Sequence, residues 1–192
     1  MVRRQTTVES LLREHKLKTY CMIIQNSTLN DIPAIFSLYK VATEYQKLNF
    51  PENQWPEFSP ALIKTEINEN RQWKLIDENK IACIWAHTFS DPQIWEERNV
   101  DAAIYIHRIA TSPTLRGRNY VSEIVTWSRK FAKQNEKKFI RMDTCGENKK
   151  LIAHYINCGF NFLGMKRLKN PVGLPSHYVN TEVCFFEIKL SD

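Results

Sequence analysis

The sequence predicts a domain of mixed α and β structure, in which helices pack in layers against a sheet. Apolar residues at helical spacing alternate along the chain with short runs of β-forming residues. The 192 residues are 43% hydrophobic and 25% charged, an ordinary globular composition that can bury a sizeable core. No repeat or low-complexity tract interrupts this pattern. We therefore expect one domain over residues 21–192, preceded by an arm or short helix over residues 1–20.

The first half of this domain is predicted to hold two helices and a hairpin. The apolar run that starts at Cys21 indicates a strand. A helix should follow over residues 30–48, since Asn30 or Asp31 can cap it and Pro33 suits its first turn. The stretch "NFPENQWPEFSP" contains three prolines and must be a loop, after which Pro60 can start a second helix. The two strands of the hairpin are expected in "WKLIDE" and "KIACIWAHTF".

The second half is predicted to contain a buried strand and two further helices. Residues 102–111, "AAIYIHRIAT", are nearly continuous in apolar and β-forming residues, as in a strand covered on both faces. A helix should begin at Tyr120, and another should run from Asn148, as its cap, to Gly159. The other strands are expected in "FIRMDT", "FNFLGMKRL" and "VCFFEIKL", the last two joined by the irregular segment "KNPVGLPSHYVNTE".

Charge and cysteine usage limit the classes of function. With 27 Lys and Arg against 21 Asp and Glu, the net charge of +6 suits an anionic ligand or a nucleic acid, or a merely basic solvated surface. The five cysteines are scattered, without paired or metal-ligand spacing, so we expect reduced thiols and no metal. The chain opens with no signal-peptide pattern and holds no run of about 20 apolar residues. These features predict a soluble, cytoplasmic protein that does not enter a membrane.

Two motifs give the sequence a resemblance to a known family. The near-continuous strand leads into "RIATSPTLRGRNYV" and a helix, and "NKKLIAHYINCGF" follows after one more strand. This order resembles the GCN5-related N-acetyltransferase (GNAT) family over roughly residues 22–190. In the second motif Asn148, Ala153, Tyr155, Gly159 and Phe160 all fall where that family places them. The resemblance implies a central mixed, mostly antiparallel twisted sheet with helices on both faces.

The first motif departs from the family pattern. In the family an R/Q-x-x-G-x-G/A loop binds the pyrophosphate of acetyl-CoA through backbone amides. Here Arg116 matches, but Asn119 and Val121 replace the later glycines, and a side chain at either position could crowd the phosphates. Asparagine tolerates positive φ, so we expect the turn to persist. The resemblance implies that acetyl-CoA is bound by Ile109, Ala110, Thr111, Arg116, Gly117, Arg118, Asn119, Tyr120, Val121 and Asn148.

Catalytic and acceptor-binding candidates follow from the same resemblance. A tyrosine at the position of Tyr155 protonates the departing CoA thiolate in the family, although Tyr155 could also merely pack its helix face. His107 and Glu44 are candidate general bases, with Asp143 as a third, and His107 could equally be a core residue. The candidate acceptor-binding residues are Asp143, for which a structural role is the alternative, and His177 and Tyr178, which could equally belong to a plain surface loop.

These residues together predict an acetyl-CoA-dependent N-acetyltransferase. An amine would attack the thioester directly, with Ile109 near the backbone N–H that stabilises the oxyanion. The expected acceptor is a small-molecule or peptide amine, and the sequence does not name it. A CoA-binding or ligand-sensing protein without turnover is the alternative, based on Asn119 and Val121. Nucleic-acid binding ranks last, because the basic residues are interspersed with acids, and the sequence leaves a homodimer open.

Overall fold

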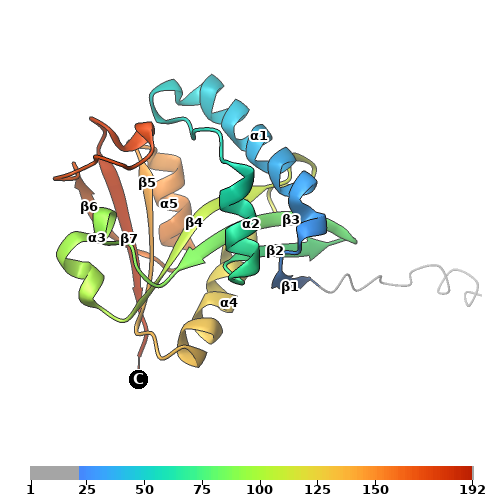
Figure 1. Cartoon of the computed structure of the whole chain (residues 1–192). Coiled ribbons are helices and arrows are strands. Elements are labelled where there is room, and N and C mark those ends of the chain that lie inside the picture. The colour runs from blue at the N-terminus through green and yellow to red at the C-terminus, as the bar shows by residue number, and fades with distance from the viewer. Residues whose placement is uncertain (1–21, 192) are drawn as a thin grey trace, which may run out of the picture.

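A seven-stranded sheet organises the protein in the order β1-β2-β3-β4-β5-β7-β6 (Figure 1). The structure is a computed structural model and describes residues 22–191, so the predicted arm over residues 1–20 lies outside the described residues. Among the strand pairs formed by residues 22–191, only β4–β5 is parallel. The strands are β1 (Ile23–Asn26), β2 (Gln72–Asp77), β3 (Lys80–Thr88), β4 (Ala103–Thr111), β5 (Phe139–Cys145), β6 (Asn161–Lys166) and β7 (Val183–Lys189).

Helices cover both faces of this sheet, which confirms the predicted fold class. The α-helices are α1 (Ile32–Asn49), α2 (Pro60–Asn68), α3 (Pro92–Trp95), α4 (Tyr120–Gln134) and α5 (Lys149–Asn157). Short 3-10 turns join them: η2 (Leu29–Asp31), η3 (Pro51–Asn53), η4 (Glu96–Val100), η5 (Pro113–Leu115) and η6 (Ser176–Tyr178). Among residues 22–191, no helix is both long and apolar enough to cross a membrane.

The strand period of two divides the core into layers. On β3, Cys83 and Trp85 belong to the core under α4 and α5, whereas Ile84 between them packs with α1 and α2. All three residues are fully buried. Burying a side chain of this size contributes about 1.5–3 kcal/mol, so each helix layer is held to the sheet by its apolar face.

The segment between β3 and β4 was not predicted to have regular structure. It contains the single-turn helix α3 followed by η4. Four residues are too few to show an apolar period of 3.6, which explains why the spacing did not reveal α3. Ile94 and Trp95 anchor α3 in a core on the α1 and α2 face of the sheet. This segment places Asp91, the N-cap residue of α3, beside β4.

The central feature of the fold is the divergence of β4 and β5. Their parallel ladder covers only residues 103–106 against 139–142. Directly after it, Arg108 adopts φ 54° and the β3–β4 register shifts between Ile84 and Ala86, which marks a bulge. Beyond the bulge β4 stays paired with β3 and β5 with β7, so the two strands part (Figure 1). The sheet therefore opens into a wedge whose apex lies at Ile106 and Met142.

Candidate active site

A cleft of about 1710 Å³ occupies the wedge between β4 and β5. It is lined by residues of α1, α2, β4, β5 and α5, by the loop before α4, and by η6. Tyr155 belongs to the core on the α4 and α5 face, whereas His107 follows Ile106 on β4 and points to the opposite face. Because both residues line the cleft, it passes through the sheet from one face to the other.

The loop at the mouth of the cleft keeps the shape of an anion-binding turn. Gly117 has φ 84° and Asn119 has φ 53°, so the asparagine adopts the left-handed conformation expected of it. A Cβ atom added to Gly117 would meet nothing within 4 Å, which leaves open space beside the backbone. Tyr120 and Val121 begin α4, and the first N–H groups of a helix have no carbonyl partner within it. The turn thus presents N–H groups and the positive end of a helix dipole.

The side chains that replace the family's glycines are held by local contacts, although both residues line the cleft. Val121 is 8% exposed and packs into the core beneath the loop. The Asn119 amide donates to Ser122 Oγ at 2.7 Å, and its oxygen accepts from Cys158 Sγ at 3.4 Å. Tyr120 is also buried, and its hydroxyl donates to Asp77 Oδ2 at 2.8 Å. The departures from the motif therefore leave the space beside Gly117 free of their side chains.

The two arginines of the loop differ in their availability. Arg116 lines the cleft, and its guanidinium lies 5.1 Å from the ring centroid of Tyr45 on α1. Arg118 contacts Asp77 at 2.8 Å and Glu78 at 2.6 Å, and it is not among the residues that line the cleft. The expectation that Arg118 contacts the cofactor is therefore not supported, because two carboxylates already neutralise its charge.

The β4 edge and helix α5 form the middle of the cleft. Ile109, Ala110 and Thr111 all line it, on the edge of β4 that has left its ladder with β5. Asn148 caps α5, as predicted, because its side-chain oxygen accepts from Leu151 N at 3.1 Å. Tyr155 is 7% exposed, and its ring packs 5.2 Å from that of Phe186. Burial raises the pKa of Tyr155, so its hydroxyl keeps its proton at neutral pH.

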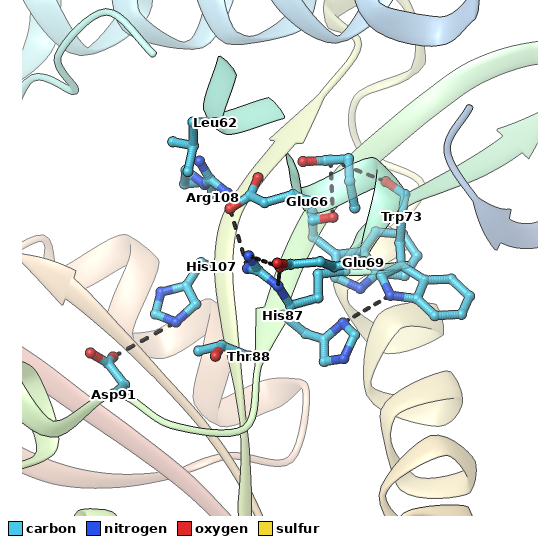
Figure 2. Close-up of polar contacts among 12 residues, drawn as sticks. Leu62, Glu66, Glu69, Trp73, His87, Thr88, Asp91, His107 and Arg108 are labelled. Carbon is cyan, nitrogen blue, oxygen red and sulfur yellow. Dashed lines mark hydrogen bonds and ion pairs between the residues drawn. The ribbon is translucent and has the colours of Figure 1, made fainter. Parts of the chain in front are cut away.

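On the opposite face, Asp91, His107 and Asp143 form one cluster at the apex of the wedge, which we call the Asp–His–Asp cluster. His107 Nε2 lies 3.7 Å from Asp91 Oδ2 (Figure 2). One imidazole nitrogen of His107 and one carboxylate oxygen each of Asp91 and Asp143 all lie within 4.8 Å of one another. Within the described part of the chain, this is the one set of three His, Cys, Asp or Glu side chains close enough to hold a cation together.

Burial shifts the pKa values within the Asp–His–Asp cluster toward neutral forms. It lowers the pKa of His107 to about 3, and the positive charge of Arg108 adds to this shift. Burial and the nearby charge of Asp143 raise the pKa of Asp91 to about 7. Burial raises the pKa of Asp143 to about 6. The aspartates, rather than the imidazole, therefore titrate close to neutral pH.

The segment between β6 and β7 closes over this cluster. The Tyr178 hydroxyl donates to Asp143 Oδ2 at 2.8 Å, and both His177 and Tyr178 line the cleft. His177 Nδ1 is buried without a hydrogen-bond partner among the described residues, and burial lowers the pKa of His177 to about 4. The structure thus brings His107, Asp143, His177 and Tyr178 together, although "LPSHY" is more than thirty positions from Asp143 in sequence.

Glu44 is not part of this site. Its side chain is 59% exposed and lies 4.0 Å from Lys40 on the surface of α1. The helix turns Ala42, Tyr45 and Gln46 toward the cleft instead. The expectation that Glu44 acts as a base is therefore not supported, because its carboxylate does not line the cleft.

Two groups at the site were missed from the sequence. Asp91 precedes a proline, a pattern that indicates a helix cap but gives no link to His107. Arg108 makes a hydrogen-bonded ion pair with Glu66 of α2, and both residues line the cleft (Figure 2). The spacing of helix α2 indicates only that Glu66 shares a face with Ile63 and Ile67. Both contacts depend on tertiary structure.

Comparisons with known proteins agree with this architecture. No curated protein matches the chain significantly in sequence. A GNAT-family acetyltransferase from Listeria monocytogenes has a TM-score of 0.66 at 19% identity, covering 88% of this chain and 95% of that chain. The ribosomal-protein-S18-alanine N-acetyltransferase of Escherichia coli has a TM-score of 0.62 at 13% identity, covering 90% and 96%. YncA from Salmonella typhimurium, solved with its cofactor acetyl-CoA, has a TM-score of 0.63 at 10% identity, covering 90% and 95%.

These structures share the fold, and the family is shown by the sequence itself. The model of the acetyltransferase (GNAT) family matches residues 33–160, which include α1, the wedge strands, the loop before α4 and helix α5. With this match over more than half of its length, the chain belongs to the acetyltransferase (GNAT) family, whose members are acyl-CoA N-acyltransferases.

Proposed function

We propose that this protein transfers an acetyl group from acetyl-CoA to a primary amine by direct attack of the amine on the thioester. The observation that carries the proposal is the single cleft that passes through the sheet at the β4–β5 wedge. One face offers an anion-binding turn and Tyr155, and the other offers the Asp–His–Asp cluster. Such a cleft lets two substrates approach one reaction centre from opposite faces.

The residues of the loop before α4 suit the pyrophosphate of acetyl-CoA. The N–H groups from Gly117 to Val121 would face the phosphates, with the end of the α4 dipole behind them. Arg116 can add a charge-assisted hydrogen bond, since it makes no ion pair among the described residues. The fit rests on the open space beside Gly117.

The middle of the cleft would hold the thioester. The free edge of β4 near Ile109 can supply a backbone N–H to the carbonyl oxygen as negative charge develops there. Tyr155 would donate its proton to the departing thiolate. Burial keeps that proton on the hydroxyl in the resting enzyme, so a donor is in place when the thiolate forms. Asn148 lines the cleft at the N-terminal end of α5, where its side chain caps the helix.

The acceptor would enter from the α1, α2 and α3 face. Asp143, His177 and Tyr178 line that side and are the residues we assign to acceptor binding. The proposed acceptors include both small molecules and peptides that carry a primary amine. The E. coli neighbour acts on an alanine of a ribosomal protein, which illustrates the second class on this fold.

The proposal is tested by measuring thiol release from acetyl-CoA against a panel of primary amines. The panel contains amino acids, polyamines, aminoglycosides and peptides with free N-termini. We expect at least one amine to stimulate thiol release above hydrolysis and to gain the acetyl group in mass spectra. Tight CoA binding without stimulation by any amine would favour the CoA-binding or ligand-sensing alternative.

A further inference from the structure

The proposed function, on which this inference rests, leaves open how the amine loses its proton. A primary amine reaches the enzyme mainly as an ammonium ion at neutral pH, and only the neutral amine can attack a carbonyl. The sequence suggested His107, Glu44 or, as a third candidate, Asp143 as the base. In the structure Asp143 Oδ2 already accepts a hydrogen bond from the Tyr178 hydroxyl. Glu44 lies outside the cleft, and His107 is a poor proton acceptor where it is buried near Arg108.

The Asp–His–Asp cluster lies where a nucleophile would wait. His107 and Asp143 are the first residues beyond the last paired position of the wedge, Ile106 with Met142. They point away from the face that holds Tyr155, because side chains alternate along each strand. Asp91 reaches the same point from the N-cap of α3 (Figure 2). A thioester in the wedge would therefore have Tyr155 on one side and this cluster on the other.

The spacing of the cluster leaves room for an ammonium group or a small metal ion. Three acceptors at about 2.8 Å from one tetrahedral nitrogen lie about 4.6 Å from each other. Ligand atoms around a tetrahedral zinc ion, bound at about 2 Å, lie only about 3.3 Å apart. In the cluster the acceptor atoms lie within 4.8 Å of one another, and the His107–Asp91 pair is 3.7 Å apart. The separation of that pair lies between the two values and nearer to the zinc spacing, so the unpaired oxygen of Asp91, rather than this distance, carries the choice of an ammonium group.

No protein cation is hydrogen-bonded to the two carboxylates among the described residues. Arg108, which follows His107 on β4, is held by Glu66 of α2. Asp91 Oδ2 is buried and accepts no hydrogen bond, and Asp143 Oδ2 accepts one from the Tyr178 hydroxyl. A buried oxygen without a donor is costly, and an incoming N–H group would remove that cost.

We propose that the Asp–His–Asp cluster binds the ammonium group of the acceptor and that the carboxylate of Asp91 takes its proton. His107 and Asp143 are positioning residues in this scheme, since each accepts one of the remaining N–H hydrogens. Asp91 is the proton acceptor because its Oδ2 has no other donor.

The proton and electron count closes over the reaction. One N–H bond of the ammonium breaks and an O–H bond forms on Asp91, which leaves a neutral amine. Its lone pair forms the new C–N bond, and the C–S bond breaks with its electrons on sulfur. The nitrogen then loses its second proton to solvent. The thiolate gains a proton from Tyr155, and a proton from solvent restores the Tyr155 hydroxyl. Asp91 then releases its proton to water, so each turnover yields amide, thiol and one proton.

The groups around Asp91 decide how the cluster titrates. His107 and Tyr105 face it from β4, Asp143 from β5 and Tyr178 from η6. Burial raises the pKa values of both tyrosines, which therefore stay neutral beside it. Asp143 is the negative charge that opposes ionisation of Asp91.

The test compares kcat/KM as a function of pH for wild type, Asp91→Asn and the control Glu97→Gln. Asparagine is as good an N-cap as aspartate and carries no buried charge, so the Asp91→Asn variant should fold. Glu97 is 74% exposed and pairs with Lys169 outside the cleft. Glu97→Gln therefore removes one carboxylate, as Asp91→Asn does, but not from the cleft. Acetyl-CoA affinity, measured by calorimetry, reports whether each variant keeps an intact acetyl-CoA site.

We expect Asp91→Asn to lower kcat at pH 7 by about 100-fold or more with unchanged acetyl-CoA affinity. The deficit should shrink as the pH approaches the pKa of the acceptor, because the amine then arrives already neutral. The wild-type profile should show an acidic limb that the variant lacks. Glu97→Gln should follow wild type throughout, and His107→Gln should mainly raise KM for the amine while keeping that limb.

Four results would overturn the inference. A deficit in Asp91→Asn that is the same at every pH would indicate a structural role. Loss of wild-type activity on treatment with EDTA, restored by Zn²⁺, would assign the cluster to a metal ion. A third result is full kcat of Asp91→Asn at pH 7 when wild type binds acetyl-CoA and acetylates amines. That result would refute the proton transfer to Asp91 but leave the proposed function intact. Wild type without amine-dependent thiol release would refute both.

Discussion

The proposed role of Tyr155 depends on one contrast in its surroundings. The Tyr155 ring packs against Phe160 and Phe186 in the core, and Tyr155 also lines the cleft. An apolar environment opposes the phenolate, so the hydroxyl is a donor in the resting enzyme. A tyrosine that merely packed its helix would need no access to the cleft. The packing and the proposed acid role therefore use different parts of the same side chain.

Removing only the hydroxyl of Tyr155 separates these two parts. In Tyr155→Phe we expect kcat to fall about tenfold or more, because the thiolate then leaves without an acid. Acetyl-CoA affinity should stay within about twofold, since the ring remains in place. Stopped-flow thiol detection under single-turnover conditions measures the chemical step. An unchanged rate in that step would remove Tyr155 from the mechanism.

Individual residues differed in how well the sequence could predict their surroundings. Asn148 as a helix cap and the positive φ of Asn119 follow from local rules, and both occur in the structure. The partners of Arg118 lie on the β2–β3 turn about forty positions away, so no local pattern could reveal them. The same applies to Asp91, whose proximity to His107 depends on how α3 folds back onto β4.

At the scale of elements, the loop before α4 keeps its turn with one glycine. Gly117 and Asn119 both adopt positive φ, and the Asn119 side chain is tied to Ser122 rather than to the open space. The Val121 side chain packs in the core. A loop of this kind needs backbone conformation and room near the phosphates, and both survive the loss of the other glycines.

Two substitutions at Asn119 test this account of the loop. Asn119→Ile should weaken CoA binding about tenfold or more, because a β-branched residue opposes positive φ. Asn119→Gly should bind CoA at least as well as wild type. Calorimetric titrations at two salt concentrations should also show pantetheine binding more weakly than CoA, with a gap that narrows as salt screens the phosphates. Equal affinity of the Ile variant and wild type would show that the turn does not hold the phosphates.

A junction between the loop after α1 and the segment before β7 closes the acceptor side of the cleft. Asn53 of η3 accepts a hydrogen bond from Thr181 Oγ1 at 3.0 Å and lies against Gly146 at the end of β5. A Cβ atom on Gly146 would come within 2.1 Å of the Asn53 amide nitrogen. The loop after α1 and the segment before β7 thus meet over the cleft because residue 146 has no side chain.

Substitution of Gly146 should open this junction. In Gly146→Ala the φ of 76° becomes strained by about 1 kcal/mol and Asn53 must move. We expect a higher KM for the amine and little change in acetyl-CoA affinity. Steady-state kinetics with each substrate varied in turn measures both effects, and Gly173→Ala, at φ 89° with Gln93 at 3.8 Å, is a control for strain alone. Equal effects of the two variants would contradict a role for the junction in acceptor binding.

The order of elements was predictable to a large extent, whereas the opening of the sheet was not. Strand and helix periods located the main strands and helices near their observed bounds. The wedge depends on a bulge at Arg108, a residue with positive φ whose guanidinium is held by Glu66. Arginine has no special preference for that conformation, so the bulge is imposed by tertiary contacts that a single sequence does not display.

At the scale of the whole molecule, buried titratable groups should shape the pH dependence of stability. The folded pKa of Asp91 is raised from 3.8 to about 7, so the folded state binds more protons than the unfolded state between these values. Its contribution to the free energy of unfolding therefore falls as the pH rises through this window. His87, His107 and His177 have folded pKa values lowered to about 4, about 3 and about 4, so they favour unfolding as the pH drops below about 6.5.

Asp91→Asn isolates the first of these contributions. The free energy of unfolding of the variant relative to wild type should increase between about pH 4 and 7 and level off above. Each pKa unit corresponds to about 1.4 kcal/mol, so the change should reach the order of a few kcal/mol. Urea unfolding of both proteins across this range measures it. A difference that does not vary with pH would show that the Asp91 carboxylate is not desolvated in the folded state.

The central claim is that one cleft through the sheet joins acetyl-CoA to an amine. Its most direct test is transfer of a deuterated acetyl group from labelled acetyl-CoA to an amine, followed by mass spectrometry alongside thiol release. We predict that labelled amide and free thiol appear in equal amounts and that Tyr155→Phe slows both together. Release of thiol without labelled amide, or binding of acetyl-CoA with neither product for any amine tested, would contradict the claim.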